Sequence, residues 1–157
     1  MTPKTDGGFD PSLQNILTTL LLVLLVLFAI SALDSKTPLL AVVKGVSMLP
    51  TLREGDIVFL KSASPGDIRV GDVVVYTTPR GELVIHRVIG VVVDHETNTY
   101  YYRTEGDNNV IEDLPNYERG LGVPYSRIVG KVVEFNGYVF KIPYLGYITL
   151  LLRSLRP

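Results

Sequence analysis

Residues 82–93 read ELVIHRVIGVVV, and this run of β-branched side chains is the stretch that decides the fold. Such residues favour strands because their side chains pack well on a pleated surface. Similar runs occur between Gly, Pro and Asp residues at 39–43, 56–61, 72–77, 99–103 and 127–135. Short strands separated by turn residues predict a mostly β protein, with an antiparallel β-barrel or sandwich over residues 34–157. The loop TPRG at residues 78–81 predicts that 72–77 and 82–93 pair as a hairpin.

The composition restricts the chemistry that this domain can perform. The chain has 157 residues with a net charge of -1, so it has no basic field to hold nucleic acid. It has no cysteine, which excludes disulfides, thiolate metal clusters and cysteine nucleophiles. It has only two histidines, so a multi-histidine zinc site is excluded as well. We therefore expect no metal and no cofactor, and any catalysis must use hydroxyls, carboxylates, lysines or the two imidazoles.

A long apolar segment precedes the β region. Residues 16–33 read ILTTLLLVLLVLFAISAL and carry no charge. At about 1.5 Å per residue, 18 helical residues span roughly 27 Å, which is close to the hydrocarbon core of a bilayer. We interpret residues 16–33 as a transmembrane anchor that follows an N-terminal tail, residues 1–15. A cleaved signal peptide is the competing interpretation, but the run exceeds a usual signal core and no clear cleavage site follows it.

Two residues of the β region could carry nucleophilic chemistry. Ser47 lies where a strand-like run ends and Pro50 can start a short helical turn, so its hydroxyl could be presented beside backbone N–H groups. His86 lies inside the strand 82–93, where alternation places it on the same face as Val84 and Val88. Taken alone, a serine in a turn and a histidine among valines are more often structural. His95 lies in a polar turn and is expected to be solvated.

The segment 104–126 breaks the strand pattern. It is polar and longer than a simple hairpin loop, and long structured loops in compact domains tend to be functional. It contains Asp107, within GDNN at residues 106–109, and Asp113. A serine, a strand histidine and a carboxylate in one domain would supply the nucleophile, base and orienting acid that acyl transfer needs.

These segments together resemble the type I signal peptidases, in particular the archaeal and endoplasmic-reticulum branch, which pairs serine with histidine instead of lysine. The matching segments are SMLPT at residues 47–51, GDVV at 71–74, IHRV at 85–88, GDNN at 106–109 followed by Asp113, and IPYLG at 142–146. The resemblance covers nearly everything from the anchor to the C-terminus. The family commonly has a serine two residues before the nucleophile, where this chain has Gly45, so the second oxyanion donor is not identified.

The resemblance implies a membrane-bound serine endopeptidase that cleaves signal peptides from translocated secretory preproteins. It implies Ser47 as nucleophile, His86 as base and Asp113 as the orienting acid, with Asp107 as a supporting or alternative acid. It also implies a lipid bilayer and possible accessory membrane subunits or a translocon as partners. Basic residues flanking the anchor weakly favour a cytoplasmic C-terminal part, but signal peptides are cleaved after translocation. We therefore expect residues 34–157 outside the cytoplasm, in the cell membrane or the endoplasmic reticulum membrane.

The alternative function is a membrane-tethered β domain that binds a partner protein without catalysis. Residues 142–152, IPYLGYITLLL, are apolar but too few to span a bilayer. They predict either a last core element or, with Arg153 and Arg156, a membrane-associating C-terminal segment over residues 142–157.

Overall fold

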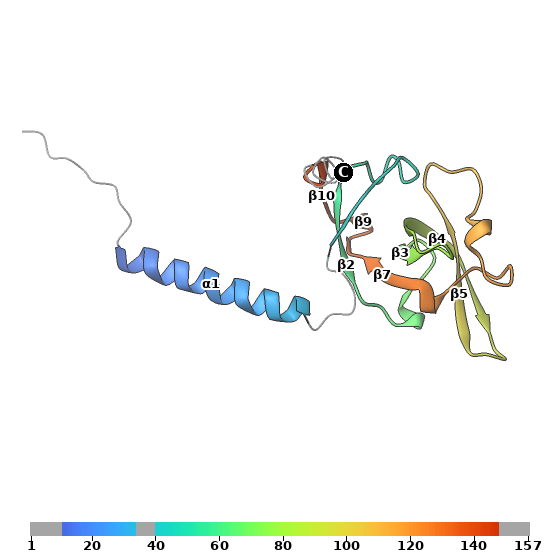
Figure 1. Ribbon diagram of the computed structural model, residues 1–157, viewed down its shortest axis with the longest axis horizontal. Helices are drawn as coiled ribbons and strands as arrows, with labels where there is room; N and C mark the ends of the chain where they lie inside the picture. Colours follow the sequence, from blue (N-terminus) through green and yellow to red (C-terminus); the bar gives the residue numbers. More distant parts are fainter. Residues whose placement is uncertain (1–10, 34–39, 148–157) are drawn as a thin grey trace, which may run out of the picture. The chain divides into compact units, whose positions relative to one another are not determined.

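The computed structural model describes residues 11–33 and 40–147, which belong to two compact units divided between Lys36 and Thr37 (Figure 1). The first unit contributes one helix, α1 (Pro11–Leu33), which contains the predicted segment 16–33. Among the described residues, no helix combines the length and the apolar character needed to cross a membrane. The second unit is built from antiparallel strands. The prediction of a mostly β chain that begins with a helix is therefore confirmed.

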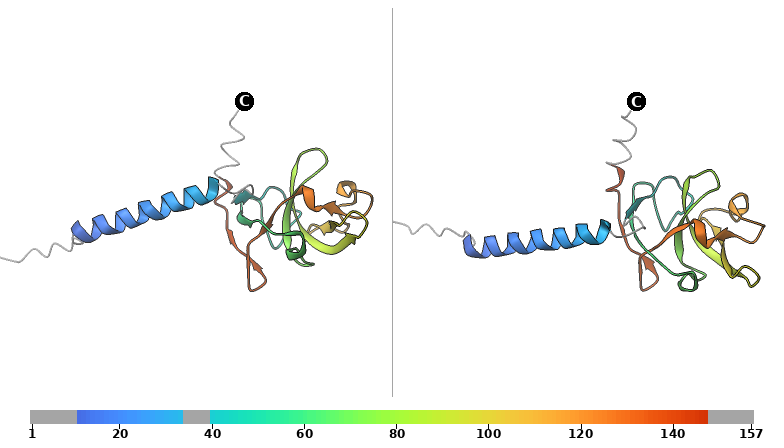
Figure 2. Two further views of the ribbon diagram at one scale, coloured as in Figure 1. Left: turned by 90° about the horizontal axis from the view of Figure 1, so that it is seen from below. Right: turned by 60° about the horizontal axis from the view of Figure 1, so that its bottom comes forward.

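The β domain consists of one large antiparallel sheet and one two-stranded ribbon. The large sheet has the order β1-β2-β7-β3-β4-β5-β6, and β10 also pairs with β2. The ribbon is formed by β8 and β9 and protrudes from the domain (Figure 2). The strands are β1 (Leu40–Val42), β2 (Ile57–Lys61), β3 (Val73–Thr77), β4 (Leu83–Asp94), β5 (Thr99–Glu105), β6 (Val123–Pro124), β7 (Ile128–Val132), β8 (Glu134–Phe135), β9 (Tyr138–Val139) and β10 (Lys141–Ile142). Three single-turn 3-10 helices connect them: η1 (Pro65–Asp67), η2 (Leu114–Asn116) and η3 (Tyr125–Arg127).

Strand β3 is buried on both faces, which explains its uninterrupted apolar sequence. Successive side chains of a strand point to opposite faces. Val73 and Val75 accordingly belong to one hydrophobic cluster, together with β2 and β7 residues. Val74 and Tyr76 belong to a second cluster, together with β4, β5 and β6 residues. We call these the first and the second cluster.

The register of β3 and β4 places His86 on the face of the second cluster. Val74 is the direct partner of His86, and Thr77 is the partner of Leu83, which confirms the predicted hairpin. Val88 lies inside the second cluster, whereas Ile85 packs against the first. The predicted alternation of side chains along β4 is therefore confirmed around His86.

The predicted single strand 127–135 is wrong in its second half. The chain forms β7, whose pairing with β3 ends at Lys131, and the Val133 N–H then donates to the Phe59 carbonyl of β2 at 2.8 Å. The residues that follow turn back at Asn136 and Gly137, which both have positive φ (51° and 80°). Two consecutive residues with positive φ form the tight turn that matches the twist of a hairpin. The Asn-Gly pair therefore forms the turn that connects β8 to β9.

The described part of the tail is attached to the β domain. Lys141 pairs with Val58 of β2, and its Nζ contacts the buried Asp56 carboxylate at 2.7 Å. Burial raises the pKa of Asp56, but the hydrogen bond and charge of Lys141 and the backbone N–H of Arg53 outweigh this and hold that pKa below its usual value. Residues 148–157, which include most of the segment predicted to associate with a membrane, lie outside the described residues.

Candidate active site

Ser47 is presented by a closed loop between β1 and β2. The Val43 N–H donates to the Asp56 carbonyl at 2.8 Å, which closes the loop at its base. Within the loop, Met48 and Leu52 are fully buried, and the Leu52 N–H donates to the Met48 carbonyl at 2.8 Å. This is one helix-like turn, where the sequence predicted a short helical turn. Because the residue after Ser47 is anchored in the core, the serine is fixed at the surface of the first cluster.

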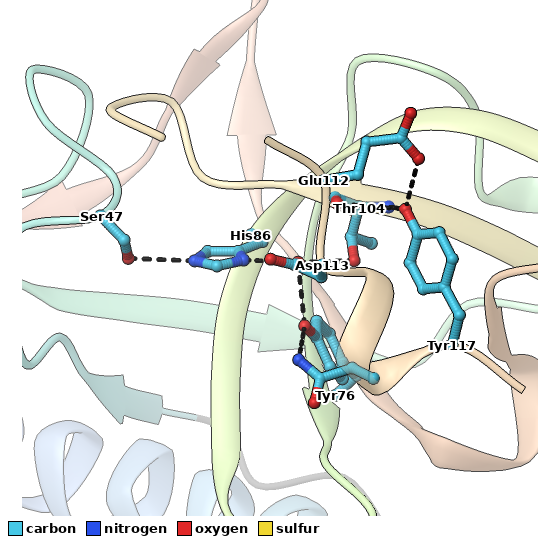
Figure 3. Close-up of polar contacts among 8 residues, drawn as sticks. Ser47, Tyr76, His86, Thr104, Glu112, Asp113 and Tyr117 are labelled. Carbon is cyan, nitrogen blue, oxygen red and sulfur yellow. Dashed lines mark hydrogen bonds and ion pairs between the residues drawn. The ribbon is translucent and has the colours of Figure 1, made fainter. Parts of the chain in front are cut away.

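Ser47, His86 and Asp113 form a continuous chain of hydrogen bonds (Figure 3). The Ser47 Oγ lies 3.0 Å from His86 Nε2, and His86 Nδ1 lies 2.6 Å from Asp113 Oδ2. An ionised carboxylate only accepts hydrogen bonds, so Nδ1 carries the proton in neutral His86 and Nε2 accepts from the serine. This tautomer is the one in which an imidazole can remove a proton from a hydroxyl.

Asp113 reaches the imidazole from the end of a short structured segment. It directly precedes η2, and its backbone N–H donates to the Thr104 carbonyl at 2.9 Å, which ties it to the end of β5. The side chain is 8% exposed, so its charge is largely removed from water. Its Oδ2 also accepts the Thr104 hydroxyl at 2.7 Å and the Tyr76 hydroxyl at 2.9 Å. A buried carboxylate requires such donors.

The structure places Asp107 with Arg87. The Arg87 guanidinium binds both carboxylate oxygens of Asp107, each at 2.7 Å, and also donates to the Gly71 carbonyl at 2.7 Å. Burial raises the pKa of Asp107, but the hydrogen bonds of Arg87 and Thr51 outweigh it, so that pKa is lowered. Asp107 is thus an ionised carboxylate held by an arginine, whereas Asp113 is the acid in contact with His86.

The loop that carries Asp107 also holds the backbone of the serine. The Asn108 N–H donates to the Ser47 carbonyl at 2.8 Å, and the Asn108 side-chain amide donates to the Val46 carbonyl at 3.2 Å. Gly106 lies so close that a Cβ there would be 2.6 Å from the Ser47 carbonyl oxygen. The GDNN sequence therefore does more than form an Asx turn, because it fixes the position of the serine main chain.

Tyr76 and Thr104 are site residues that the sequence analysis missed. Tyr76 comes two residues after Val74, the partner of His86, and so lies on the same face of the sheet. That spacing follows from the predicted hairpin and could have identified it. Thr104 is paired with Val88 on the next strand, and a register with a bulge between Val88 and Gly90 cannot be read from sequence.

His95 and the carboxylates of Asp56 and Asp72 lie apart from this chain of hydrogen bonds. His95 is exposed in the turn between β4 and β5, as predicted. The buried carboxylates of Asp56 and Asp72 face Lys141 and Lys131. Within residues 11–33 and 40–147, no group of three or more carboxylate or imidazole side chains is arranged to hold a metal ion.

Comparison with known proteins identifies the family. Residues 12–96 match the family described as signal peptidase, peptidase S26. The chain belongs to this family. The match covers the serine loop, β3 and all of β4, and so includes Ser47 and His86. The resemblance inferred from the sequence is confirmed.

Relatives of this signal peptidase family member include catalytic subunits of signal peptidase complexes. The chain is 39% identical over 120 residues to the signal peptidase complex catalytic subunit SEC11 of Lachancea thermotolerans, covering 74% of this chain and 67% of the relative. It is 33% identical over 133 residues to that of Schizophyllum commune, covering 74% of this chain and 65% of the relative. It is 30% identical over 122 residues to SEC11C of Homo sapiens, covering 76% and 59%. The chain thus spans about three fifths to two thirds of these relatives.

Gly106→Ala should displace the serine without unfolding the domain. The added methyl group would press on the Ser47 carbonyl oxygen and on Asn109, both closer than 3.0 Å to its position. A shift of about 1 Å in a nucleophile can lower turnover on the order of 100-fold. The matched control is Gly66→Ala, because a Cβ at Gly66 meets nothing within 4 Å. Peptide cleavage and thermal unfolding should be measured for both, and equal activity of the two variants would contradict the packing argument.

Proposed function

We propose that this chain is a membrane-bound serine endopeptidase that cleaves N-terminal signal peptides from translocated secretory preproteins. The observation that carries the proposal is the unbroken hydrogen-bond chain from Ser47 Oγ through His86 to Asp113. Membership of the signal peptidase family and the similarity to catalytic subunits of signal peptidase complexes support it.

The proposed reaction follows from the directions of these hydrogen bonds. Ser47 Oγ attacks the carbonyl carbon of the scissile bond while its proton passes to His86 Nε2, giving a tetrahedral intermediate. The imidazolium then gives this proton to the leaving amine, and the acyl-enzyme remains. A water molecule, deprotonated by the same imidazole, releases the new carboxylate and regenerates the serine. Asp113 stays ionised throughout and holds the Nδ1 proton, which keeps the ring in the productive tautomer.

The developing oxyanion would lie at the main chain of the serine loop. Gly45 has no side-chain donor, and its φ of +88° is a conformation that other residues rarely adopt. Within the described residues, the N–H groups of Ser47 and Met48 donate to no backbone carbonyl. We propose the Ser47 N–H as the first oxyanion donor, because main-chain N–H groups beside a nucleophile serve this role.

We further propose that residues 16–33 anchor the enzyme in a bilayer, with residues 1–15 in the cytoplasm and residues 34–157 outside it as a barrel-like domain. The uncharged run of 18 residues supports the anchor, and two hydrophobic clusters on opposite faces of β3 support the barrel-like core. An anchor would confine enzyme and substrate to one bilayer and so raise their effective concentration. Residues 142–157 would rest at the membrane surface, and accessory membrane subunits or a translocon would be the partners.

Ser47→Ala should abolish cleavage of a signal-bearing preprotein by the purified full-length chain in detergent or vesicles. Loss of a triad nucleophile typically costs about 10⁴-fold or more in turnover. Mature product should be measured by gel shift and mass spectrometry. Ser62→Ala, at an exposed serine that directly follows β2, is the matched control and should retain full activity. A preprotein that binds without being cut by the unmodified chain would favour a binding domain over an enzyme.

Asp113→Asn should be much more damaging than Asp107→Asn. An amide at residue 113 has no negative charge to stabilise the imidazolium, and its NH2 group can donate to Nδ1 and hold the wrong tautomer, so a loss of roughly 10³–10⁴-fold in turnover is expected. An amide at residue 107 keeps one acceptor for Arg87, so a loss within about tenfold is expected. Initial cleavage rates at matched protein amounts decide the order. The reverse order would transfer the role of orienting acid to Asp107.

Removal of residues 1–33 should release the chain from membranes. In alkaline carbonate extraction the full-length chain should remain in the pellet, since an apolar helix cannot be removed by charge and pH alone. The truncated chain should appear in the supernatant, and a chain that lacks only residues 1–10 should behave like the full-length chain. Pelleting of the chain that lacks residues 1–33, with an intact circular dichroism spectrum, would show that residues 16–33 are not its anchor.

A further inference from the structure

We propose that the buried hydroxyls of Tyr76 and Thr104 are positioning residues that limit how strongly Asp113 attracts the proton of His86. Both hydroxyls donate to Asp113 Oδ2, at 2.9 Å and 2.7 Å, and this is the same oxygen that accepts from His86 Nδ1 at 2.6 Å (Figure 3). Three donors therefore share one carboxylate oxygen. The inference rests on the proposed roles of His86 and Asp113 as base and orienting acid.

The surrounding hydrogen bonds fix the direction of the Tyr76 hydroxyl. The Asn116 side-chain amide donates to the Tyr76 oxygen at 3.0 Å, so the phenolic proton is directed to Asp113. Burial and the negative charge of Asp113 raise the pKa of Tyr76 well above its usual value, so this phenol keeps its proton throughout the working pH range. Tyr76 is therefore a permanent donor to the carboxylate.

The Thr104 hydroxyl is fixed by its main chain. The Thr104 N–H donates to the Tyr117 hydroxyl at 2.9 Å, and the Thr104 carbonyl accepts the Asp113 N–H at 2.9 Å. These two bonds hold the residue beside Asp113, and its side chain is fully buried. An ionised carboxylate has no proton to give, so the Thr104 hydroxyl must donate to Oδ2.

The expected consequence concerns the charge that His86 faces. Each hydroxyl places a partial positive charge against Oδ2, so less negative charge is available to stabilise the imidazolium. The imidazole therefore stays neutral, and able to accept the serine proton, at lower pH. The imidazolium that forms during the reaction is also a better donor to the leaving amine. The two hydroxyls thus extend the activity toward acidic pH while they hold the carboxylate in place.

Other charged and titratable groups also surround His86 and Asp113. Asp107 lies near the imidazole but is bound by Arg87 from the same strand as His86. The Glu112 carboxylate and the Arg103 guanidinium form an exposed ion pair beside Asp113, and Tyr117 donates to Glu112. None of these groups bonds to Asp113 Oδ2, and none is altered by removing the hydroxyls of Tyr76 or Thr104. A change in titration can therefore be assigned to the two hydroxyls.

The test compares histidine titrations in the full-length chain by NMR. The chain has two histidines, and the exposed His95 serves as an internal reference in every sample. Tyr76→Phe and Thr104→Val remove one hydroxyl each, whereas Thr104→Ser keeps it. Tyr102→Phe is the matched control, because this tyrosine is equally buried in the second cluster but donates to the Pro65 carbonyl. The same variants are assayed for the pH dependence of kcat/KM.

Tyr76→Phe and Thr104→Val should each move the His86 titration midpoint and the acid limb of kcat/KM upward by about 0.5–1 pH unit. This is only part of the free energy of one hydrogen bond to a charged group, because the hydroxyl bonds Asp113 in both protonation states of His86. KM should stay unchanged, Thr104→Ser should restore the midpoint, and Tyr102→Phe and His95 should not move. A fixed midpoint in Tyr76→Phe and Thr104→Val, or an equal shift in Tyr102→Phe, would overturn the inference.

The titration test still gives an answer if Tyr76→Phe does not fold or if the chain does not cleave a preprotein. If Tyr76→Phe fails to fold, as judged by circular dichroism, the comparison of Thr104→Val with Thr104→Ser decides the inference. The NMR midpoint does not depend on cleavage. A shifted midpoint in a chain that never cleaves a preprotein would therefore reject the proposed function and retain the electrostatic effect, whereas normal cleavage with an unmoved midpoint would reject only the present inference.

Discussion

The burial of the Asp113 carboxylate is the constraint on which the arrangement of the domain depends. A carboxylate that is 8% exposed is stable only if donors replace the water it has lost. Those donors come from three adjacent strands: Tyr76 from β3, His86 from β4 and Thr104 from β5. All three lie on the face of the second cluster, and a slip of one residue in either pairing would turn a donor to the other face. The three hydrogen bonds to Asp113 Oδ2 therefore favour the observed register of β3, β4 and β5.

The serine reaches this face from a different part of the sheet, so it must be positioned by main-chain contacts. Its loop leaves β1 and is closed at the base by β2, and the Asn108 N–H and side-chain amide link the Ser47 and Val46 carbonyls to the loop after β5. That loop begins against Ser47 and ends at Asp113. This loop therefore connects the nucleophile to the acid through about six residues of backbone. A displacement of either residue would consequently displace the other.

Much of the fold could be predicted from local patterns, and the reasons are particular. The β-branched runs around His86 and the TPRG turn gave β3, β4 and their pairing, because alternation and turn chemistry are local properties. The resemblance of the SMLPT and IHRV segments gave Ser47 and His86. The break after β7 was missed although Asn136 and Gly137 are a strong hairpin signal, because the β-branched run before them was taken as one strand. Thr104 could not be predicted, since its place depends on a bulge in β4.

The different contacts of Asp107 and Asp113 follow from the alternation of side chains along β4. His86 and Arg87 are neighbours in β4, so their side chains point to opposite faces and cannot share one partner. Each face therefore needs its own acid. Arg87 binds Asp107 through both oxygens, which leaves that carboxylate no free geometry for an imidazole. Asp113, six residues further along the same loop, is then the carboxylate left for His86. The adjacent residues His86 and Arg87 therefore contact two different carboxylates, because their side chains leave the strand on opposite faces.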